Sequence, residues 1–188
     1  MGEIRNVIPP AKLVFGLLVT SEPLRQTCLE QLMAEFGPLD HQSPVEPFTF
    51  TDYYFDEMGQ VIFRQYLSAE RLVDMATLPE LKLRTNQMEI EMALVDERGR
   101  RRRQVNIDPG YVTQSKLVLA TTKDYTHRIY VADGIFAEVT LHYQRPHGFR
   151  PLPWSYPDYA RREVCEFFNK VRETYRQQLR GKDITLGV

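Results

Sequence analysis

The chain has 188 residues, which is enough for one well-filled core but short for two domains of ordinary size, so a single domain over residues 1–188 is expected. Its composition, 43% hydrophobic and 26% charged, is typical of a globular protein and excludes a largely disordered chain. With 24 basic and 25 acidic residues, the formal net charge is −1, so no overall field draws the protein to nucleic acid or to an anionic membrane.

The N-terminal quarter predicts a strand followed by a helix. Residues 12–20 (KLVFGLLVT) form a continuous apolar run, as expected for a central strand covered on both faces. The run is far shorter than the roughly 20 residues that cross a bilayer, so no membrane segment is expected. A helix capped by Ser21 is predicted next, since apolar residues recur at helical spacing until Gly37-Pro38: Leu24, Cys28, Leu32 and Phe36.

The next segment predicts an edge hairpin and a second helix. Residues 39–50 are punctuated by proline and suit an irregular lead into an edge strand that ends near residues 48–50. Residues 56–59 suit a turn, and residues 61–67 suit the partner strand. Thr77 and Glu80 have the spacing of a capping box, which predicts a helix over about residues 78–95. Its apolar residues are expected on one side and beside it: Leu83, Ile90 and Leu94, with Leu81, Met88, Met92 and Val95 next to them.

Two short strands are predicted after this helix. In the first, residues 101–108, Val105 and Ile107 share one face and Asn106 and Asp108 the other. Pro109-Gly110 has the residues that a type II turn favours at its centre. Residues 115–122 (SKLVLATT) fit a buried strand or a short helix, and we favour the strand.

Residues 126–143 predict a hairpin whose register can be argued. If Ile129 and Val131 are to be buried on the same face as the apolar residues after Gly134, the loop must have three residues, 132–134, with Gly134 left-handed. This register places Arg128 directly opposite Glu138 on the polar face.

The C-terminal quarter predicts a proline-stiffened connector over residues 151–157, which holds Trp154, and then a helix. The element order β-α-β-β-α-β resembles a ferredoxin-like split βαβ core, extended here by a β-hairpin and a C-terminal helix. The expected fold class is therefore α+β with a mostly antiparallel sheet.

The common catalytic signatures are absent from the sequence. It contains no GxxxxGK[ST] phosphate loop, no GxGxxG, no HExxH and no GxSxG. The four histidines are scattered, so no metal site is predicted. Cys28 and Cys165 lie on apolar stripes without CxxC spacing, which indicates reduced core thiols and favours a cytoplasmic location.

The polar stretch between Asn106 and Tyr143 holds the main candidate residues. Asn106 and Asp108 could hold a hydroxyl, an amine or metal-bound water, or they could simply brace a turn. Lys123, His127 and Arg128 could grip an anionic group, since a guanidinium matches phosphate and carboxylate geometry. The alternative is a solvated loop beside an Arg128–Glu138 pair.

Two further patterns are less specific. Asp52 and Tyr54 follow a predicted strand and could supply a base and a stacking surface, although tyrosines there are more often caps of the core. Residues 98–103 contain five arginines, at positions 98, 100, 101, 102 and 103. RNA contact through Arg98, Arg100, Arg101, Arg102 and Arg103 is conceivable, but no aromatic residues interleave with them for base stacking, which favours a solvated loop.

Five strings carry a family resemblance: FTFTDYYFDEMG, VNIDPGY, SKLVLATTKDYTHRIY, DGIFAEVTLHY and PLPWSYPDY. They are similar to those of domain-of-unknown-function family 4416 of bacteria and archaea, from Lys12 to about Tyr175. No activity is established for that family, so the resemblance implies only which polar residues belong to its strings. These are Asp52, Tyr53, Tyr54, Asn106, Asp108, Gly110, Lys116, Lys123, Asp124, His127, Arg128, Asp133 and Glu138.

Together these patterns predict a cytoplasmic domain that binds, and could act on, an anionic small molecule such as a phosphorylated or carboxylate ligand. Neither a reaction nor a cofactor can be assigned from the sequence. The alternative is a non-catalytic module for RNA or protein. The candidate ligand-binding residues are Asp52, Tyr54, Asn106, Asp108, Lys116, Lys123, Asp124, His127, Arg128 and Glu138.

Overall fold

Strand β1 (Ala11–Val19) lies at the centre of the computed structural model, which describes residues 8–180. All nine of its residues are buried, as expected for a strand covered on both faces. It pairs antiparallel with β4 (Phe63–Val73) on one side and with β7 (Val105–Val112) on the other. Alternate side chains point to opposite faces, so Phe15 and Leu17 enter one core cluster and Val14 enters another.

Within the described residues, nine strands form one antiparallel sheet, with the order β11-β10-β8-β7-β1-β4-β2 along its main path. Strand β3 adds to β4, and β9 adds to β10. The α+β class is confirmed, while the specific ferredoxin-like topology stays a prediction. The remaining strands of the sheet are β2 (Leu39–Gln42), β3 (Glu46–Pro47), β8 (Lys116–Thr121), β9 (Ile129–Ala132), β10 (Ile135–Gln144) and β11 (Gly148–Pro151).

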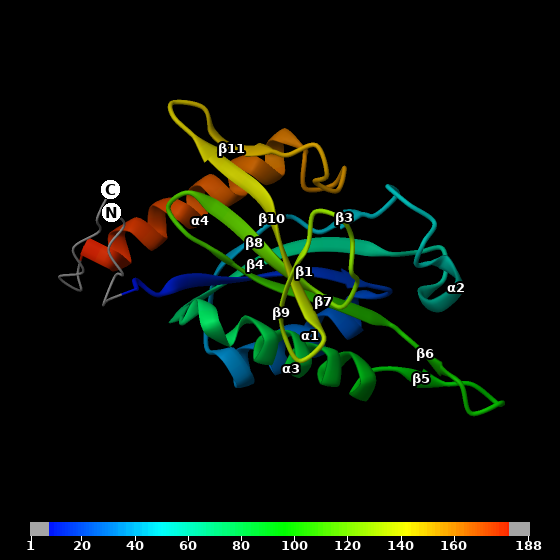
Figure 1. The fold of residues 1–188 in the computed structure, drawn as a ribbon. Coiled ribbons are helices and arrows are strands. Elements are labelled where there is room, and N and C mark those ends of the chain that lie inside the picture. Colours follow the sequence, from blue (N-terminus) through cyan, green and yellow to red (C-terminus); the bar gives the residue numbers. More distant parts are fainter. Residues whose placement is uncertain (1–7, 181–188) are drawn as a thin grey trace.

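Helices cover both faces of the sheet (Figure 1). Helix α1 (Glu22–Phe36) and helix α3 (Leu78–Glu91) pack on one face, and helix α4 (Arg162–Arg180) packs on the other. A 3₁₀ turn, η1 (Met75–Thr77), precedes α3, and the single-turn helix α2 (Phe55–Met58) stands where a turn was expected. Among the described residues, no helix is both long and apolar enough to cross a membrane.

The predicted second helix is shorter than expected, and only part of its predicted apolar side is buried, including Leu81 and Met88. It ends at Glu91, and the chain then forms a small hairpin of β5 (Leu94–Val95) and β6 (Arg101–Arg102), which projects from the body in Figure 1. Leu83 and Ile90 are exposed, whereas Lys82 and Glu89 are buried. The polar pair is buried because it binds the backbone of β7. The capping-box prediction was also wrong, since the side chain of Thr77 caps no helix amide.

Pro109-Gly110 forms no turn; β7 runs straight through it. Pairing with β8 begins at Gly110, opposite Leu119, and extends only towards Val112. Pro109 has no backbone N–H, so the β7–β8 ladder does not continue from Gly110 towards the start of β7. A Cβ on Gly110 would lie 2.2 Å from the carbonyl oxygen of Val118, so only glycine permits the close approach there. The dipeptide therefore marks the point at which two neighbouring strands separate.

The β9–β10 hairpin keeps the predicted register but uses a different turn. Asp133 and Gly134 both have positive φ, 52° and 74°, so the loop has two residues of the type I′ kind. Ala132 pairs with Ile135, and after a register shift Tyr130 pairs with Phe136, so Val131 is the extra residue of a bulge. Ile129 and Val131 are exposed rather than buried. The bulge restores the register that a three-residue loop would have given.

Candidate functional site

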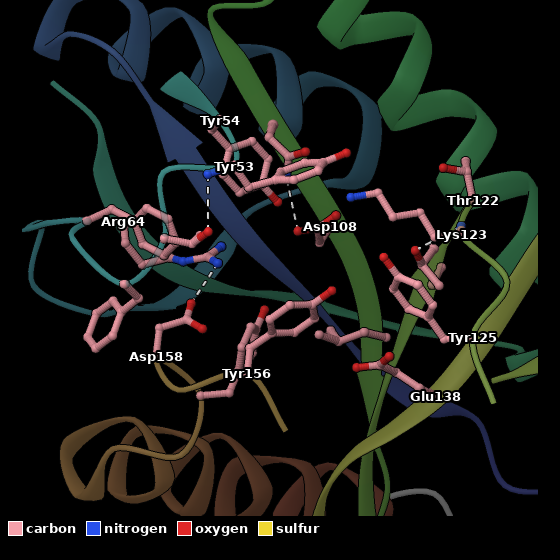
Figure 2. A pocket seen from close by; sticks show the side chains of 18 of the residues that line it. Tyr53, Tyr54, Arg64, Asp108, Thr122, Lys123, Tyr125, Glu138, Tyr156 and Asp158 are labelled. Carbon is pink, nitrogen blue, oxygen red and sulfur yellow. Dashed lines mark hydrogen bonds and ion pairs between the residues drawn. The ribbon is translucent and has the colours of Figure 1, made fainter. Parts of the chain in front are cut away.

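The separation of β7 from β8 opens a cavity of about 490 Å³ (Figure 2). This volume falls within the range of roughly 300–1,000 Å³ that is usual for small-molecule sites. Its walls come from the segment before α2, from β4, α3, β7, β8 and β10, and from the connector before α4. The lining residues are Phe48, Phe50, Thr51, Tyr53, Tyr54, Arg64, Lys82, Asn86, Arg103, Asn106, Asp108, Leu119, Ala120, Thr121, Thr122, Lys123, Tyr125, Arg128, Glu138, Tyr156, Pro157, Asp158 and Tyr159.

The β7 wall is held open by side chains of α3. Because β8 does not reach Ile107, its backbone N–H donates to Glu89 Oε1 at 2.7 Å and its carbonyl accepts from Lys82 Nζ at 2.9 Å. Lys82 also contacts Asp108 Oδ1 at 3.2 Å, and the amide of Asn106 donates to Asp108 Oδ2 at 2.8 Å. The bonds from Lys82 and Glu89 satisfy the backbone groups of Ile107, which would otherwise be unpaired beside the cavity.

The charge state of this wall follows from its contacts. Desolvation opposes ionisation of Asp108, but the charges of Lys82 and Arg64 outweigh it, so the pKa of Asp108 is lowered. Burial dominates at Glu89 and raises its pKa, although Lys82 and the Ile107 N–H oppose the rise. Asp108 is therefore the anionic group that the wall presents to the cavity.

One end of the cavity is built around Arg64, on β4. The guanidinium is almost fully buried, and its Nη2 lies 2.6 Å from Asp158 Oδ2. The aromatic rings of Phe48, Tyr66 and Tyr159 surround it, with centroids 5.2–5.5 Å from its Cζ. Its Nε and Nη1 atoms find no hydrogen-bond partner within residues 8–180. The Nε and Nη1 atoms of the buried Arg64 guanidinium can therefore each donate a hydrogen bond to an additional acceptor.

The hydroxyl of Tyr159 is the third polar group without a partner at this end. Tyr159 is 2% exposed, and its hydroxyl makes no hydrogen bond within the described part of the chain. It occupies the space beside Gly16, where an added Cβ would lie 2.2 Å from the hydroxyl oxygen and 3.1 Å from Arg64 Nη1. The glycine in the middle of β1 therefore makes room for the tyrosine and the arginine.

A second buried ion pair closes another wall. Arg128 Nε donates to Glu138 Oε2 at 2.7 Å, and the remaining guanidinium nitrogens donate to the Lys123 carbonyl at 3.1 Å and the Tyr156 hydroxyl at 3.0 Å. His127 Nε2 lies 3.1 Å from the same Glu138 oxygen, and its ring stacks on Trp154 outside the cavity. Arg128 and Glu138 are both buried, so this pair holds the segment just before β9 against β10.

At the opposite side of the cavity from Arg64 in Figure 2 stands Lys123. Its ammonium lies 3.7 Å from the ring centroid of Tyr53, across the space between the segment before α2 and the segment after β8. Among residues 8–180, Lys123 forms no ion pair, whereas each of the other four cations of the lining pairs with a carboxylate. The uncompensated positive charge of the cavity is therefore located at Lys123.

The sequence matches the family described as Domain of unknown function (DUF4416) over residues 9–175. The chain belongs to this family. Comparison with curated proteins and with solved structures gave no match.

The structure brings together six of the ten residues that were proposed for this DUF4416 chain. Tyr54, Asn106, Asp108, Lys123, Arg128 and Glu138 all line the cavity. The other four do not: Asp52 and Asp124 are exposed, His127 lies behind Glu138, and Lys116 pairs with His142 at the far end of β8. The polar faces of β7 and of the β9–β10 hairpin are thus parts of one surface.

Several lining residues escaped the sequence analysis, and some had a visible signal. Arg64 interrupts the apolar run of its strand, and Gly16, which lies beside Arg64 and Tyr159 rather than in the lining, interrupts the run of β1. Both residue types are unusual inside a buried strand. Lys82 and Asp158 carried no such signal, since lysines and aspartates are common on helices and in connectors. Among the described residues, no group of three or more His, Cys, Asp or Glu is placed to hold a metal ion.

Proposed function

We propose that this domain binds a small organic anion in the cavity between β7 and β8. The observation that carries the proposal is the charge of the lining, five Lys or Arg side chains against three Asp or Glu, with Lys123 left without an ion pair in the described chain. A cation in a partly desolvated cavity attracts an anion more strongly than an exposed one does, because the local dielectric is lower.

The tyrosine rings of the lining support the organic part of the proposal. Tyr53, Tyr125 and Tyr156 line the same cavity and are partly exposed, so they can cover an apolar or aromatic portion of a ligand. Arg128 and His127 hold Glu138, and we therefore assign the ligand contact to Lys123 rather than to them.

A thermal-shift comparison tests the proposal, because a ligand that binds the native state raises its stability. Benzoate and phenyl phosphate should raise the melting temperature, and neutral benzamide should raise it less. Lys123→Met should remove most of the response to the anions, while Lys116→Met, at the other end of β8 and outside the cavity, should keep it. Equal responses in the two variants, or no response of the wild type to any anion, would contradict the proposal.

The second candidate function is an RNA contact through the β5–β6 hairpin. The hairpin projects from the body, and Arg98, Arg101 and Arg102 form no ion pair among residues 8–180. Arg100 and Arg103 are engaged with Asp96 and Glu57, which reduces the free charge. RNA affinity that falls steeply between low and moderate salt would support this function, and a flat salt response would oppose it.

A cytoplasmic location is also proposed. It is supported by Cys28 and Cys165, which are buried and unpaired among the described residues, as expected of thiols in a reducing compartment. Burial raises the pKa of the Cys28 thiol to about 12, which fits a structural rather than a reactive cysteine.

A further inference from the structure

The two ends of the cavity differ in what they require of a ligand. At the inner end, Arg64 is already neutralised by Asp158, yet its Nε and Nη1 atoms and the Tyr159 hydroxyl have no hydrogen-bond partner within residues 8–180. At the outer end, Lys123 has a charge without a counter-ion in the same range. The inner end therefore needs an acceptor atom, and the outer end needs a negative charge.

The inner end is rigid. Asp158 is fixed by the Tyr66 hydroxyl at 3.0 Å as well as by Arg64, and the guanidinium is enclosed by three aromatic rings. A buried donor without a partner disfavours the folded state, so a site that retains two such groups side by side calls for an explanation. An oxygen of a ligand, placed between Arg64 Nη1 and the Tyr159 hydroxyl, would satisfy both.

The space between the two ends is flanked by flat side chains. Figure 2 draws Arg64 and Asp158 on one side and Lys123 and Tyr125 on the other, with Asp108 and Tyr156 between them. The Tyr54 hydroxyl also resists ionisation, because burial and the Asp108 charge raise its pKa, so this tyrosine is a neutral wall. A flat or apolar spacer fits this region better than a second charged group, which Asp108 would repel if it were anionic.

We propose that the ligand is a two-ended organic acid, with a carbonyl or carboxylate oxygen held by Arg64 and Tyr159, a flat or apolar spacer, and an anionic group at Lys123. The inference rests on the proposed anion-binding function and adds the inner anchor to it. Because the Arg64–Asp158 pair is neutral overall, a neutral amide carbonyl can serve at the inner end, whereas the outer end requires a charge.

Titration calorimetry on the full chain tests the proposal with four matched probes. Terephthalate carries two acid ends, 4-carbamoylbenzoate carries one acid and one amide, benzoate carries one acid only, and terephthalamide carries no charge. We expect the first two to bind about ten-fold or more tightly than benzoate, as a hydrogen bond to a charged donor implies, and terephthalamide to bind most weakly. Succinate through sebacate then locate the preferred span.

Two hydroxyl deletions separate the anchor from general stability. Tyr159→Phe should lower the affinity for terephthalate towards that for benzoate, because only the Arg64 donors remain at the inner end. It should not lower the melting temperature, because the deleted hydroxyl has no partner in the described chain. The control, Tyr175→Phe, removes a hydroxyl that donates to the Pro10 carbonyl at 2.8 Å far from the cavity, so it should lower the melting temperature and leave the affinity unchanged.

The outcomes distinguish the two proposals. If benzoate binds through Lys123 but the two-ended probes bind no better, or if Tyr159→Phe leaves their affinity unchanged, the inner anchor is wrong and anion binding stands. If none of the anions binds to the wild type, the proposed function itself fails. The comparison of probes on the wild type decides the question even if a variant does not fold.

Discussion

Buried charged side chains are the residues on which this site depends. All four are buried, Arg64, Lys82, Arg128 and Glu138, and each is satisfied at least in part by an opposite charge. Bringing a charge out of water costs several kcal/mol, which its partner must offset. Removing one member of such a pair is therefore expected to cost far more than removing one member of a surface pair.

Glu138→Gln tests this expectation at the β9–β10 pair. The change leaves Arg128 buried without its counter-charge, so the free energy of unfolding should fall by about 3–5 kcal/mol. Glu166→Gln is the matched control, because its partner Arg162 at 2.8 Å is exposed and solvent screening leaves such a pair with little effect on stability. Urea unfolding of the two variants measures the difference, and similar losses would contradict the role assigned to Glu138.

Gly16 offers a prediction of coupling between two residues. Gly16→Ala places a Cβ 2.2 Å from the Tyr159 hydroxyl, so it should destabilise the fold by about 1–3 kcal/mol through overpacking. In a Tyr159→Phe background the nearest remaining atom is Arg64 Nη1 at 3.1 Å, so the same change should cost clearly less. A double-mutant cycle in urea measures the coupling, and additive losses would show that the tyrosine is not the obstacle.

At the scale of elements, the site exists because β7 and β8 pair over only part of their length. Gly110 brings the strands into close contact, Pro109 ends the ladder, and α3 supplies Lys82 and Glu89 to the backbone that β8 leaves free. The dipeptide was predicted as a turn because proline and glycine favour turns in isolation. Only the pairing of β7 with β1 and β8 shows that Pro109 and Gly110 instead lie inside a strand, where β7 and β8 separate.

The β9–β10 turn yields a prediction about backbone conformation. At Gly134, φ is 74° and an added Cβ would meet no atom within 4 Å, so Gly134→Ala should cost about 1–2 kcal/mol through the left-handed conformation alone. Asp133→Asn is the control, because asparagine adopts this conformation at least as readily, and its effect should stay within about 0.5 kcal/mol. Thermal unfolding of both variants measures the losses, and an unaffected Gly134→Ala would contradict the type I′ turn.

At the scale of the whole molecule, strong periodic segments were predictable and long-range polar contacts were not. The apolar run of β1 and the helical spacing of α1 identified these two elements. A strand buried on both faces and a helix buried along one stripe each leave a pattern of apolar residues that are close together in the sequence. The burial of Lys82 depends on a β7 backbone 25 positions away, and that of Arg64 on Asp158, 94 positions away in the sequence. Six candidates still met in one cavity, because Tyr54, the polar residues of β7 and β10, and the segment between β8 and β9 border the same gap in the sheet.

The charge network of the cavity also makes the stability of the molecule depend on pH. The pKa of Asp108 is lowered in the folded state against the opposing effect of desolvation, by the charges of Lys82 and Arg64. An unfolded chain has an ordinary aspartate pKa of roughly 3.9, so as the pH falls through that value the unfolded state takes up a proton before the folded state does. The contribution of Asp108 is therefore complete above the unfolded pKa and is lost as the pH falls through the lower, folded pKa.

Asp108→Asn isolates this contribution from that of the other carboxylates. At pH 7 the wild type should have the larger free energy of unfolding, since the variant leaves Lys82 with less counter-charge. The difference between the two proteins should narrow as the pH is lowered from about 5 towards 2, because protonation removes from the wild type the same charge that the substitution removes. Urea unfolding at a series of pH values measures the difference. If the difference in free energy of unfolding stays constant or widens over this interval, the cavity does not hold Asp108 ionised. The β7 wall beside the spacer of the proposed ligand would then not be anionic.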